Sequence, residues 1–284
     1  MRILTFEVAT MRRLGARVGD KIIDLCEADP SLPKDMRSFI AEGQEALAQA
    51  TRAVQVFEGG IPVEEVQIKA PIYDPEKIVC IGLNYADHAA ETNNPIPAEP
   101  VVFSKFTTTL VGPNDSIPYP EVSQKVDYEV ELVAVIGKGG KNISEDDALD
   151  HVFGYTVGND VSARDYQLEK PAGQWILGKN FDSFCPIGPE IVTSDEVPDP
   201  HKLGIRCTVN GERLQDSSTD QLIFGIDKLV AYLSHVFTLT PGDLIYTGTP
   251  AGVGMGRTPP VWLKAGDSVV CEIDELGRLE NQII

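Results

Sequence analysis

The sequence has no long hydrophobic run, and this absence limits where the protein can act. Its longest apolar stretches, such as residues 132–137, are far shorter than the roughly 20 residues that a membrane-spanning helix needs. The start of the chain also lacks a secretory signal, because the charged residue Glu7 follows the first apolar residues almost at once. We therefore expect no membrane partner.

Positive charge is scarce. The chain has 24 Lys and Arg against 43 Asp and Glu, which gives a formal net charge of −19. A surface this acidic repels nucleic acids and anionic lipids at long range, so we expect no nucleic-acid partner. If the protein handles an anionic metabolite, a metal ion or local cations must reverse the field at its site.

Cysteine is also scarce, and its spacing is irregular. The cysteines are odd in number, and no two of them form a C-x-x-C pair. They are Cys26, Cys80, Cys185, Cys207 and Cys271. This pattern excludes a disulfide framework and a thiolate zinc site, and it is typical of a reducing compartment such as the cytosol or an organelle matrix.

The chain of 284 residues allows one large domain or two smaller ones. Residues 59–62 contain two glycines and a proline, and Pro71 and Pro75 follow in a linker-like segment. We therefore predict a small N-terminal domain over residues 1–70 and a main, catalytic domain over residues 71–284.

The first domain is predicted to contain both strands and a helix. Residues 2–8 and 16–25 indicate a short β-meander with turns at Gly15 and Gly19. Residues 36–56 carry apolar side chains at helical spacing and predict one helix.

The main domain is predicted to consist mostly of short strands between turns. The predicted strands are 77–82, 101–106, 128–136, 153–159, 204–209, 243–247 and 268–273, and the predicted helices are 85–92 and 226–234. Because the helices do not alternate regularly with the strands, the fold class predicted is α+β and not a doubly wound sheet.

Three carboxylates alternate along one predicted strand. Asp127, Glu129 and Glu131 share a face of this strand, because strand side chains point to opposite faces in turn. Adjacent carboxylates on a half-buried face repel one another and lose solvation, and a hard divalent cation relieves both penalties. The alternative is the solvated face of an edge strand.

A further carboxylate, Asp160, stands at the end of another apolar strand. Ser162 and Asp165 resemble a capping box, so a helix is expected to begin just after Asp160. Arg164 and Gln167, three residues apart on that helix, offer a guanidinium fork and an amide to a carboxylate group. The alternatives are a turn carboxylate for Asp160 and a surface ion pair for Arg164.

His88 and Glu91 lie three residues apart on the predicted helix 85–92. A carboxylate bonded to one imidazole nitrogen fixes the tautomer of histidine and raises its basicity, so the pair suits general base catalysis. The loop 93–97 that follows is expected to act as a lid. A surface pair without a catalytic role is the alternative.

Two lysines and a glycine-rich turn complete the candidates. Lys179 and Lys105 each interrupt an apolar stretch, so each either extends to the surface or serves a site. Thr249 lies in a turn, 247–254, that has neither P-loop nor dinucleotide-binding spacing. Its amides and the Thr249 hydroxyl can bind an anionic oxygen, unless the segment is a plain hairpin turn.

Taken together, these motifs resemble the fumarylacetoacetate hydrolase family. The resemblance covers residues 75–284, and its motifs occur in the family's order over residues 81–91, 127–132, 158–167, 175–186 and 242–254. The sequences of residues 103–106 and 179–186 most resemble the fumarylacetoacetate hydrolase domain-containing protein 2 subgroup of this family, and the resemblance extends into the N-terminal unit.

The resemblance implies a fold, a metal site and a set of roles. The fold is a mixed β-sandwich roll, usually a homodimer. The implied metal ligands are Glu129, Glu131 and Asp160, which would hold Mg²⁺, with Mn²⁺ or Ca²⁺ as alternatives. The catalytic residues implied are His88, Glu91 and Lys179, and the substrate contacts are Arg164, Gln167 and Thr249.

The resemblance also implies a small 2-oxo acid as substrate. Tautomerisation of oxaloacetate, with or without decarboxylation, is the first expectation, and hydrolysis of an acylpyruvate is the second. All three reactions pass through an enolate that a metal ion stabilises, so the motifs do not separate them. A non-catalytic binding protein would be expected to lack one of these residues. The compartment expected is the mitochondrial matrix for a eukaryotic source, with a transit peptide absent from this chain, and the cytoplasm otherwise.

Overall fold

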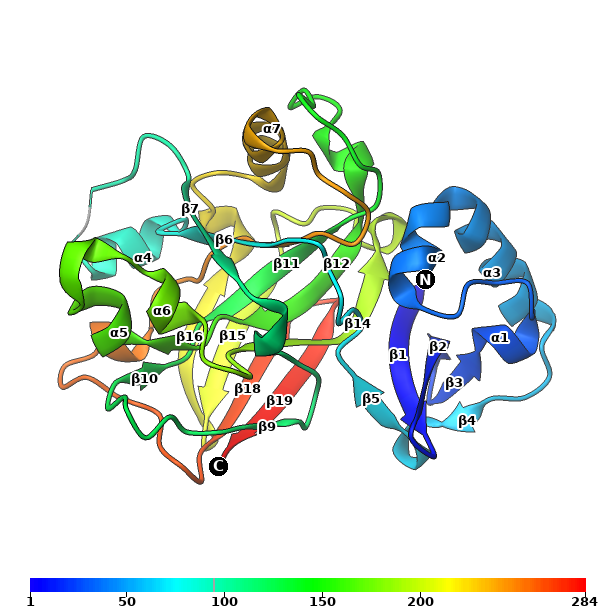
Figure 1. The fold of residues 1–284 in the computed structure, drawn as a ribbon, viewed down its shortest axis with the longest axis horizontal. Coiled ribbons are helices and arrows are strands. Elements are labelled where there is room, and N and C mark those ends of the chain that lie inside the picture. Colours follow the sequence, from blue (N-terminus) through cyan, green and yellow to red (C-terminus); the bar gives the residue numbers. More distant parts are fainter. Residues whose placement is uncertain (94) are drawn as a thin grey trace.

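The computed structural model describes residues 1–93 and 95–284. Asn94, in the loop 93–97 that we expect to act as a lid, lies outside the described residues. Within them the fold is built from one large sheet, one smaller sheet and helices on the outer faces (Figure 1).

The large sheet runs through the whole molecule. Its strand order is β4 (Ile61–Pro62), β3 (Lys21–Asp24), β2 (Met11–Val18), β1 (Arg2–Val8), β14 (Cys185–Thr193), β12 (Val152–Asn159), β11 (Val130–Ile136), β17 (Leu244–Tyr246), β6 (Ile78–Gly82) and β7 (Val101–Lys105). Two short strands lie off this path, β5 (Gln67–Lys69) on β1 and β8 (Leu110–Val111) on β14.

The smaller sheet packs against one face of the large one. Its order is β16 (Glu212–Ser218), β15 (Gly204–Val209), β18 (Ser268–Ile273), β19 (Gly277–Ile283) and β9 (Ser116–Ile117). A separate two-stranded ladder joins β10 (Val126–Asp127) to β13 (Ser162–Ala163).

The described helices are short. They are α1 (Leu25–Ala28), α2 (Met36–Glu42), α3 (Gln44–Val56), α4 (Ala86–Glu91), α5 (Arg164–Leu168), α6 (Ile176–Lys179) and α7 (Ile226–Val236). Among the described residues, no helix combines the length and the apolar character that spanning a membrane requires.

Strand β11 lies at the centre of the molecule and is buried on both faces. Val130, Leu132 and Ala134 belong to the core shared with the smaller sheet and α7. Val133 and Val135 face the other way, into a core that includes residues of α2 and α3. Burial on both faces explains the continuous apolar run in this strand, and the two packed sheets confirm the α+β sandwich that the sequence predicts.

The first 70 residues extend the large sheet. β1 pairs antiparallel with β14, and in Figure 1 the blue N-terminal elements lie beside the main body at this junction. α2 and α3 cover the sheet, and Phe39 contacts Phe153 of β12 edge to face. A division of the chain near residue 70 stays a prediction.

Two local predictions in the N-terminal unit are wrong. Gly15 lies inside β2 and not in a turn. Glycine is needed there because a Cβ would come 2.6 Å from Ile22 Cγ2. The helix predicted over 36–56 is two helices, which meet at Gly43 with φ of +63°. A positive φ cannot continue a right-handed helix.

Three strands, β14, β16 and β19, were not predicted from the sequence. β14 carries Pro186 and Pro189, which normally argue against a central strand, yet it is buried along its whole length. β16 and β19 are rich in charged and amide residues and were not predicted either. Their pairing with β15 and β18 overrides the weak propensity of these residues.

Candidate functional site

Three buried carboxylates meet where two central strands end. Glu131 lies in β11, Glu129 precedes that strand, and Asp160 follows β12. The antiparallel register pairs Val130 with Asn159, and Asp160 N donates a hydrogen bond to Glu129 O at 2.9 Å. One carboxylate oxygen from each of the three residues lies within 4.8 Å of the others.

The electrostatics of these carboxylates favour a divalent cation. Burial, together with the neighbouring charges of Asp160 and Glu129, raises the pKa of Glu131 well above its usual range. Burial acts in the same direction on Glu129, but Arg164 and Lys179 outweigh it and lower its pKa to about 2. An all-oxygen ligand set is the kind that Mg²⁺, Mn²⁺ and Ca²⁺ prefer, and a cation would relieve the repulsion on Glu131. These residues therefore fit the metal ion that the sequence predicts.

Two buried lysines reach the same carboxylates. Lys179 Nζ lies 2.8 Å from Glu129 Oε2 and 2.7 Å from Asp160 Oδ2. Burial opposes the charged form of Lys179, but Asp160 and Glu129 outweigh it and raise its pKa. Lys105 Nζ lies 2.7 Å from Asp160 Oδ1 and donates to the backbone oxygens of Lys179 and Phe184. Neither lysine extends to the surface.

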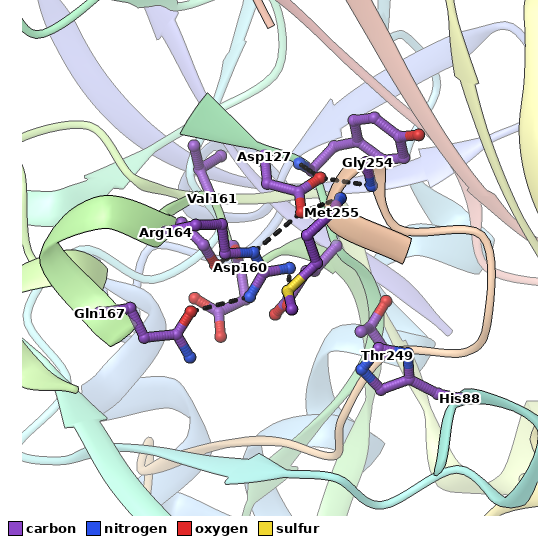
Figure 2. Close-up of polar contacts among 12 residues, drawn as sticks. His88, Asp127, Asp160, Val161, Arg164, Gln167, Thr249, Gly254 and Met255 are labelled. Atoms are coloured by element: carbon purple, nitrogen blue, oxygen red, sulfur yellow. Dashed lines mark hydrogen bonds and ion pairs between the residues drawn. The ribbon is translucent and has the colours of Figure 1, made fainter. Parts of the chain in front are cut away.

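Arg164 is held by acceptors on three sides (Figure 2). Its Nε donates to Asp127 Oδ2 at 2.8 Å, and its Nη1 donates to Gln167 Oε1 at 2.9 Å. Its Nη2 forms an ion pair with Glu129 Oε1 at 2.5 Å. Arg164 and Gln167 thus lie on one side of α5, as their spacing predicts. The capping box is wrong, because Ala163 caps α5 without a side-chain bond and Ser162 donates to Asp160 O.

His88 and Glu91 form the pair that the sequence predicts. His88 Nδ1 lies 3.2 Å from Glu91 Oε2, and His88 is buried. Glu91 Oε1 accepts a hydrogen bond from Gly252 N at 2.9 Å, so the pair is tied to the turn that follows Thr249. α4, which carries both residues, follows β6 after a short turn.

A cavity of about 210 Å³ brings the predicted residues together. Its polar lining consists of His88, Thr92, Glu129, Glu131, Asp160, Arg164, Gln167, Lys179 and Thr249. Its apolar lining comes mainly from Ile81, Leu83, Phe103, Leu168, Trp175 and Met255. Three candidates from the sequence are outside this lining. Glu91 contacts the cavity residue His88, Lys105 contacts Asp160, and Asp127 contacts Arg164.

Several supporting residues were missed or misplaced. Asp127 is not part of the carboxylate cluster; it accepts hydrogen bonds from Arg164, Gly254 N and Met255 N. Its place in the alternating acidic pattern was the only signal in the sequence, and that pattern suggested a different role.

Buried amide side chains also fix the site. Gln215 Nε2 donates to Thr249 Oγ1 at 2.8 Å, and Gln215 Oε1 accepts from Val130 N at 3.0 Å. Asn84 Nδ2 donates to Thr247 O at 2.7 Å and thereby holds the start of the same turn. Nothing in the local sequence distinguishes these two amides from surface residues.

A comparison with models of protein families finds a match over most of the chain. The model of the fumarylacetoacetate (FAA) hydrolase C-terminal family matches residues 77–284, which include all the residues that line the cavity.

Close relatives cover nearly the whole chain. The mitochondrial oxaloacetate tautomerase fahd2 of Xenopus laevis is 52% identical over 100% of this chain and 90% of its own length. The mitochondrial oxaloacetate tautomerase FAHD2A of Homo sapiens is 48% identical over 100% of this chain and 92% of its own. A fumarylacetoacetate hydrolase domain-containing protein 2 homolog of Dictyostelium discoideum is 54% identical over 96% and 92%.

Solved structures share the complete fold. A fumarylacetoacetate hydrolase from Exiguobacterium antarcticum superposes with a TM-score of 0.86 at 35% identity, covering 100% of this chain and 99% of its own. A maleylpyruvate hydrolase from Sphingobium, solved with manganese(II) and pyruvate, gives a TM-score of 0.82 at 32% identity, with coverage of 100% and 99%.

Proposed function

The chain belongs to the fumarylacetoacetate hydrolase family and is an enzyme, and we propose that it catalyses the keto–enol tautomerisation of oxaloacetate. The observation that carries this proposal is the small cavity in which three carboxylates, two cationic side chains and a histidine meet. The relatives that bear the name oxaloacetate tautomerase support the choice of substrate.

We assign the metal site to Glu129, Glu131 and Asp160, with Mg²⁺ or Mn²⁺ as the bound ion. When bound, such a cation supplies positive charge beside the substrate oxygens and stabilises the negative charge of an enolate. The three carboxylates are buried. Glu131 Oε2 accepts a hydrogen bond from Gly248 N at 2.8 Å, and the carboxylates of Glu129 and Asp160 are held by the Lys179 ammonium.

The remaining polar groups of the cavity suit a dianionic 2-oxo acid. Arg164 keeps N–H groups beyond those that bond Asp127, Gln167 and Glu129, and the Gln167 amide and the Thr249 hydroxyl face the same space. Lys179 is protonated, because its carboxylate partners raise its pKa. In our proposal these groups bind the substrate carboxylates and reverse the negative field of the protein.

The chemical step moves one proton between carbon and oxygen. His88 removes the proton from C3 of the keto form and returns it to the C2 oxygen, which yields the enol. In our proposal Glu91 Oε2 accepts a hydrogen bond from His88 Nδ1–H, which leaves Nε2 of the ring free to act as the base. The enclosing side chains exclude bulk water, which strengthens each of these charge interactions.

The size of the cavity favours tautomerisation over hydrolysis of a long acyl chain. Its volume of about 210 Å³ lies below the roughly 300–1,000 Å³ of pockets for drug-sized ligands. A four-carbon diacid suits such a space. Hydrolysis of an acylpyruvate is the second candidate, because the maleylpyruvate hydrolase of Sphingobium shares the fold.

Assembly and compartment follow the family. We propose a homodimer, and a place in the mitochondrial matrix if the source is eukaryotic, since several relatives carry the word mitochondrial in their names. For a bacterial source the cytoplasm is proposed instead.

Ultraviolet absorbance of the enol tests the proposal directly. Enol-oxaloacetate and an acylpyruvate would each be followed with the protein, once with Mg²⁺ and once with EDTA. We expect the enol signal to fall faster with protein and Mg²⁺ than with Mg²⁺ alone, and we expect the protein to give no such acceleration in EDTA. Turnover of the acylpyruvate alone would favour the hydrolase, and no effect on either would contradict both.

A further inference from the structure

Phe103 and Trp175 line two cavities at once. One is the cavity of about 210 Å³ that holds the carboxylates. The other is a more open groove of about 540 Å³ on the outside of β7 and the start of α6, lined otherwise by Val101, Val102, Ser104, Gly173, Gln174 and Ile176. No other residue is common to both linings within the described part of the chain. These two rings therefore separate the site from the groove.

We propose that Trp175 sets the longest 2-oxo acid that the site accepts. The proposal rests on the function proposed above, and it adds a residue that determines substrate length. The polar groups that would bind the carboxylate and keto oxygens form one part of the cavity lining, and the aromatic rings form part of the apolar remainder. An acyl chain that extends from the cavity toward this groove meets the Trp175 ring.

The position of the Trp175 ring is fixed by its neighbours. Gly82, the last residue of β6, lies directly beneath it, and a Cβ there would come 2.4 Å from Trp175 Cζ3. The Phe103 ring meets Trp175 edge to face, with centroids 5.7 Å apart and planes at 68°. Lys179 Nζ in turn lies 5.0 Å from the centroid of Phe103. The barrier is therefore packed from both β6 and β7, and it is not a freely moving surface side chain.

Removal of this ring should join the two spaces. In Trp175→Ala the inner cavity would open into a groove lined by Val101, Val102 and Ile176. An acyl chain that enters this groove buries methylene groups against apolar side chains. Since each buried methylene favours binding by about fourfold, two of them suffice for about a tenfold gain.

Calorimetric titration of straight-chain 2-oxo acids tests the proposal. The probes are the short acid 2-oxobutanoate and the longer acid 2-oxooctanoate, each titrated into protein saturated with Mg²⁺. We expect Trp175→Ala to bind 2-oxooctanoate at least about tenfold more tightly than the native protein does, with 2-oxobutanoate changed by less than about threefold. Val102→Ala, which alters the groove alone, should change neither value.

A second variant keeps the test possible if Trp175→Ala does not fold. Trp175→Leu keeps an apolar side chain on Gly82 but is shorter than the indole, so it should give an intermediate preference for the longer acid. If folded Trp175→Ala and Trp175→Leu bind 2-oxooctanoate no better than the native protein does, the proposal is wrong. An equal gain in affinity for both acids would also overturn the proposal, because Trp175 would then not select substrates by length.

The two proposals can fail separately. Binding of 2-oxo acids is read without turnover, so length selection by Trp175 can be established even if the native protein does not tautomerise oxaloacetate. Conversely, the native protein could tautomerise oxaloacetate while the Trp175 variants leave the length preference unchanged. The proposed function would then stand, and Trp175 would have no part in selecting substrate length.

Discussion

Asp127 Oδ2 accepts a hydrogen bond from Arg164 Nε at 2.8 Å, and both side chains are buried. The bond joins β10 to α5, so it links the segment before the carboxylate cluster to the helix that follows Asp160. Asp127 also accepts hydrogen bonds from Gly254 N and Met255 N. One carboxylate thus fixes both a proposed substrate-binding arginine and the neighbouring segment that follows Thr249 (Figure 2).

Asp127→Asn is predicted to weaken substrate binding more than turnover. All the groups around Asp127 are donors, and an asparagine amide would set its own N–H groups against some of them. We expect kcat/KM to fall by about 10–100-fold, mainly through KM, and the free energy of unfolding to fall by roughly 3 kcal/mol. Steady-state kinetics and denaturant titration measure the two effects.

Asp243→Asn is the matched control for Asp127. Asp243 is equally buried and accepts from Lys77 N and Thr240 N, but it is outside the cavity lining. The Asp243→Asn variant should be less stable than the native protein and should have the same KM. Equal KM values for the native protein and Asp127→Asn would remove Asp127 from substrate positioning.

Glu131→Gln is predicted to abolish the response to divalent cations. The native protein should gain thermal stability on addition of Mn²⁺, because a ligand that binds only the folded state stabilises it. The variant should show no such rise in Tm, and its activity should fall by at least about 100-fold. In EDTA the Tm of the variant should match or exceed that of the native protein, since a buried, repelled charge has been removed.

Differential scanning fluorimetry and Mn²⁺ titration check these outcomes. Glu212→Gln, a change at an exposed carboxylate of β16, serves as the control and should behave like the native protein. Full activity of rigorously metal-free native protein would contradict the metal site.

His88→Ala is predicted to slow tautomerisation by about 10²–10⁴-fold, because the variant lacks the proton acceptor. Decarboxylation of oxaloacetate should survive better, since its carbon–carbon bond breaks without a base. Glu91→Gln should resemble His88→Ala, because it disturbs the partner of His88 Nδ1. Both reactions should be measured on one sample at saturating Mg²⁺.

The exposed histidine of α7, His235, provides the control, and His235→Ala should leave both rates unchanged. If His88→Ala tautomerises oxaloacetate at the native rate, His88 has no catalytic role. A parallel loss of both reactions would indicate that His88 acts by ordering the site and not as the base.

Light scattering at micromolar concentration is predicted to give twice the mass of the chain. Homodimerisation rests on the family resemblance more than on any residue pattern, so this measurement tests the resemblance. A monomer at this concentration would contradict the proposed assembly.

The strands and the carboxylate cluster could be predicted because their signals are local. Alternation places Glu129 and Glu131 on one side of the chain, and the apolar strand before Asp160 leads it to the same edge. Helical spacing likewise brings His88 to Glu91 and Arg164 to Gln167.

The supporting residues could not be predicted because their partners are distant in the sequence. Gln215 bonds Val130 N and Thr249, and Asn84 bonds Thr247, across separations of 34 to 163 residues. Lys105 is a candidate from the sequence, but its ion pair with Asp160 could not be predicted, because only the folded sheet brings the two residues together. β14 was not predicted, and its strand conformation is fixed by pairing with β1 and β12 along its two edges.

β14 is bonded along one edge to β12, which leads to Asp160, and along the other to β1 of the first 70 residues. Removal of those residues would therefore leave an unprotected strand edge and uncover Ile187 and Ile191 on the apolar face beside it. Open edges of this kind recruit other chains and start aggregation. The small N-terminal unit thus acts as a cover for the catalytic sheet, and a shortened enzyme would need another means of closing that edge to remain dispersed.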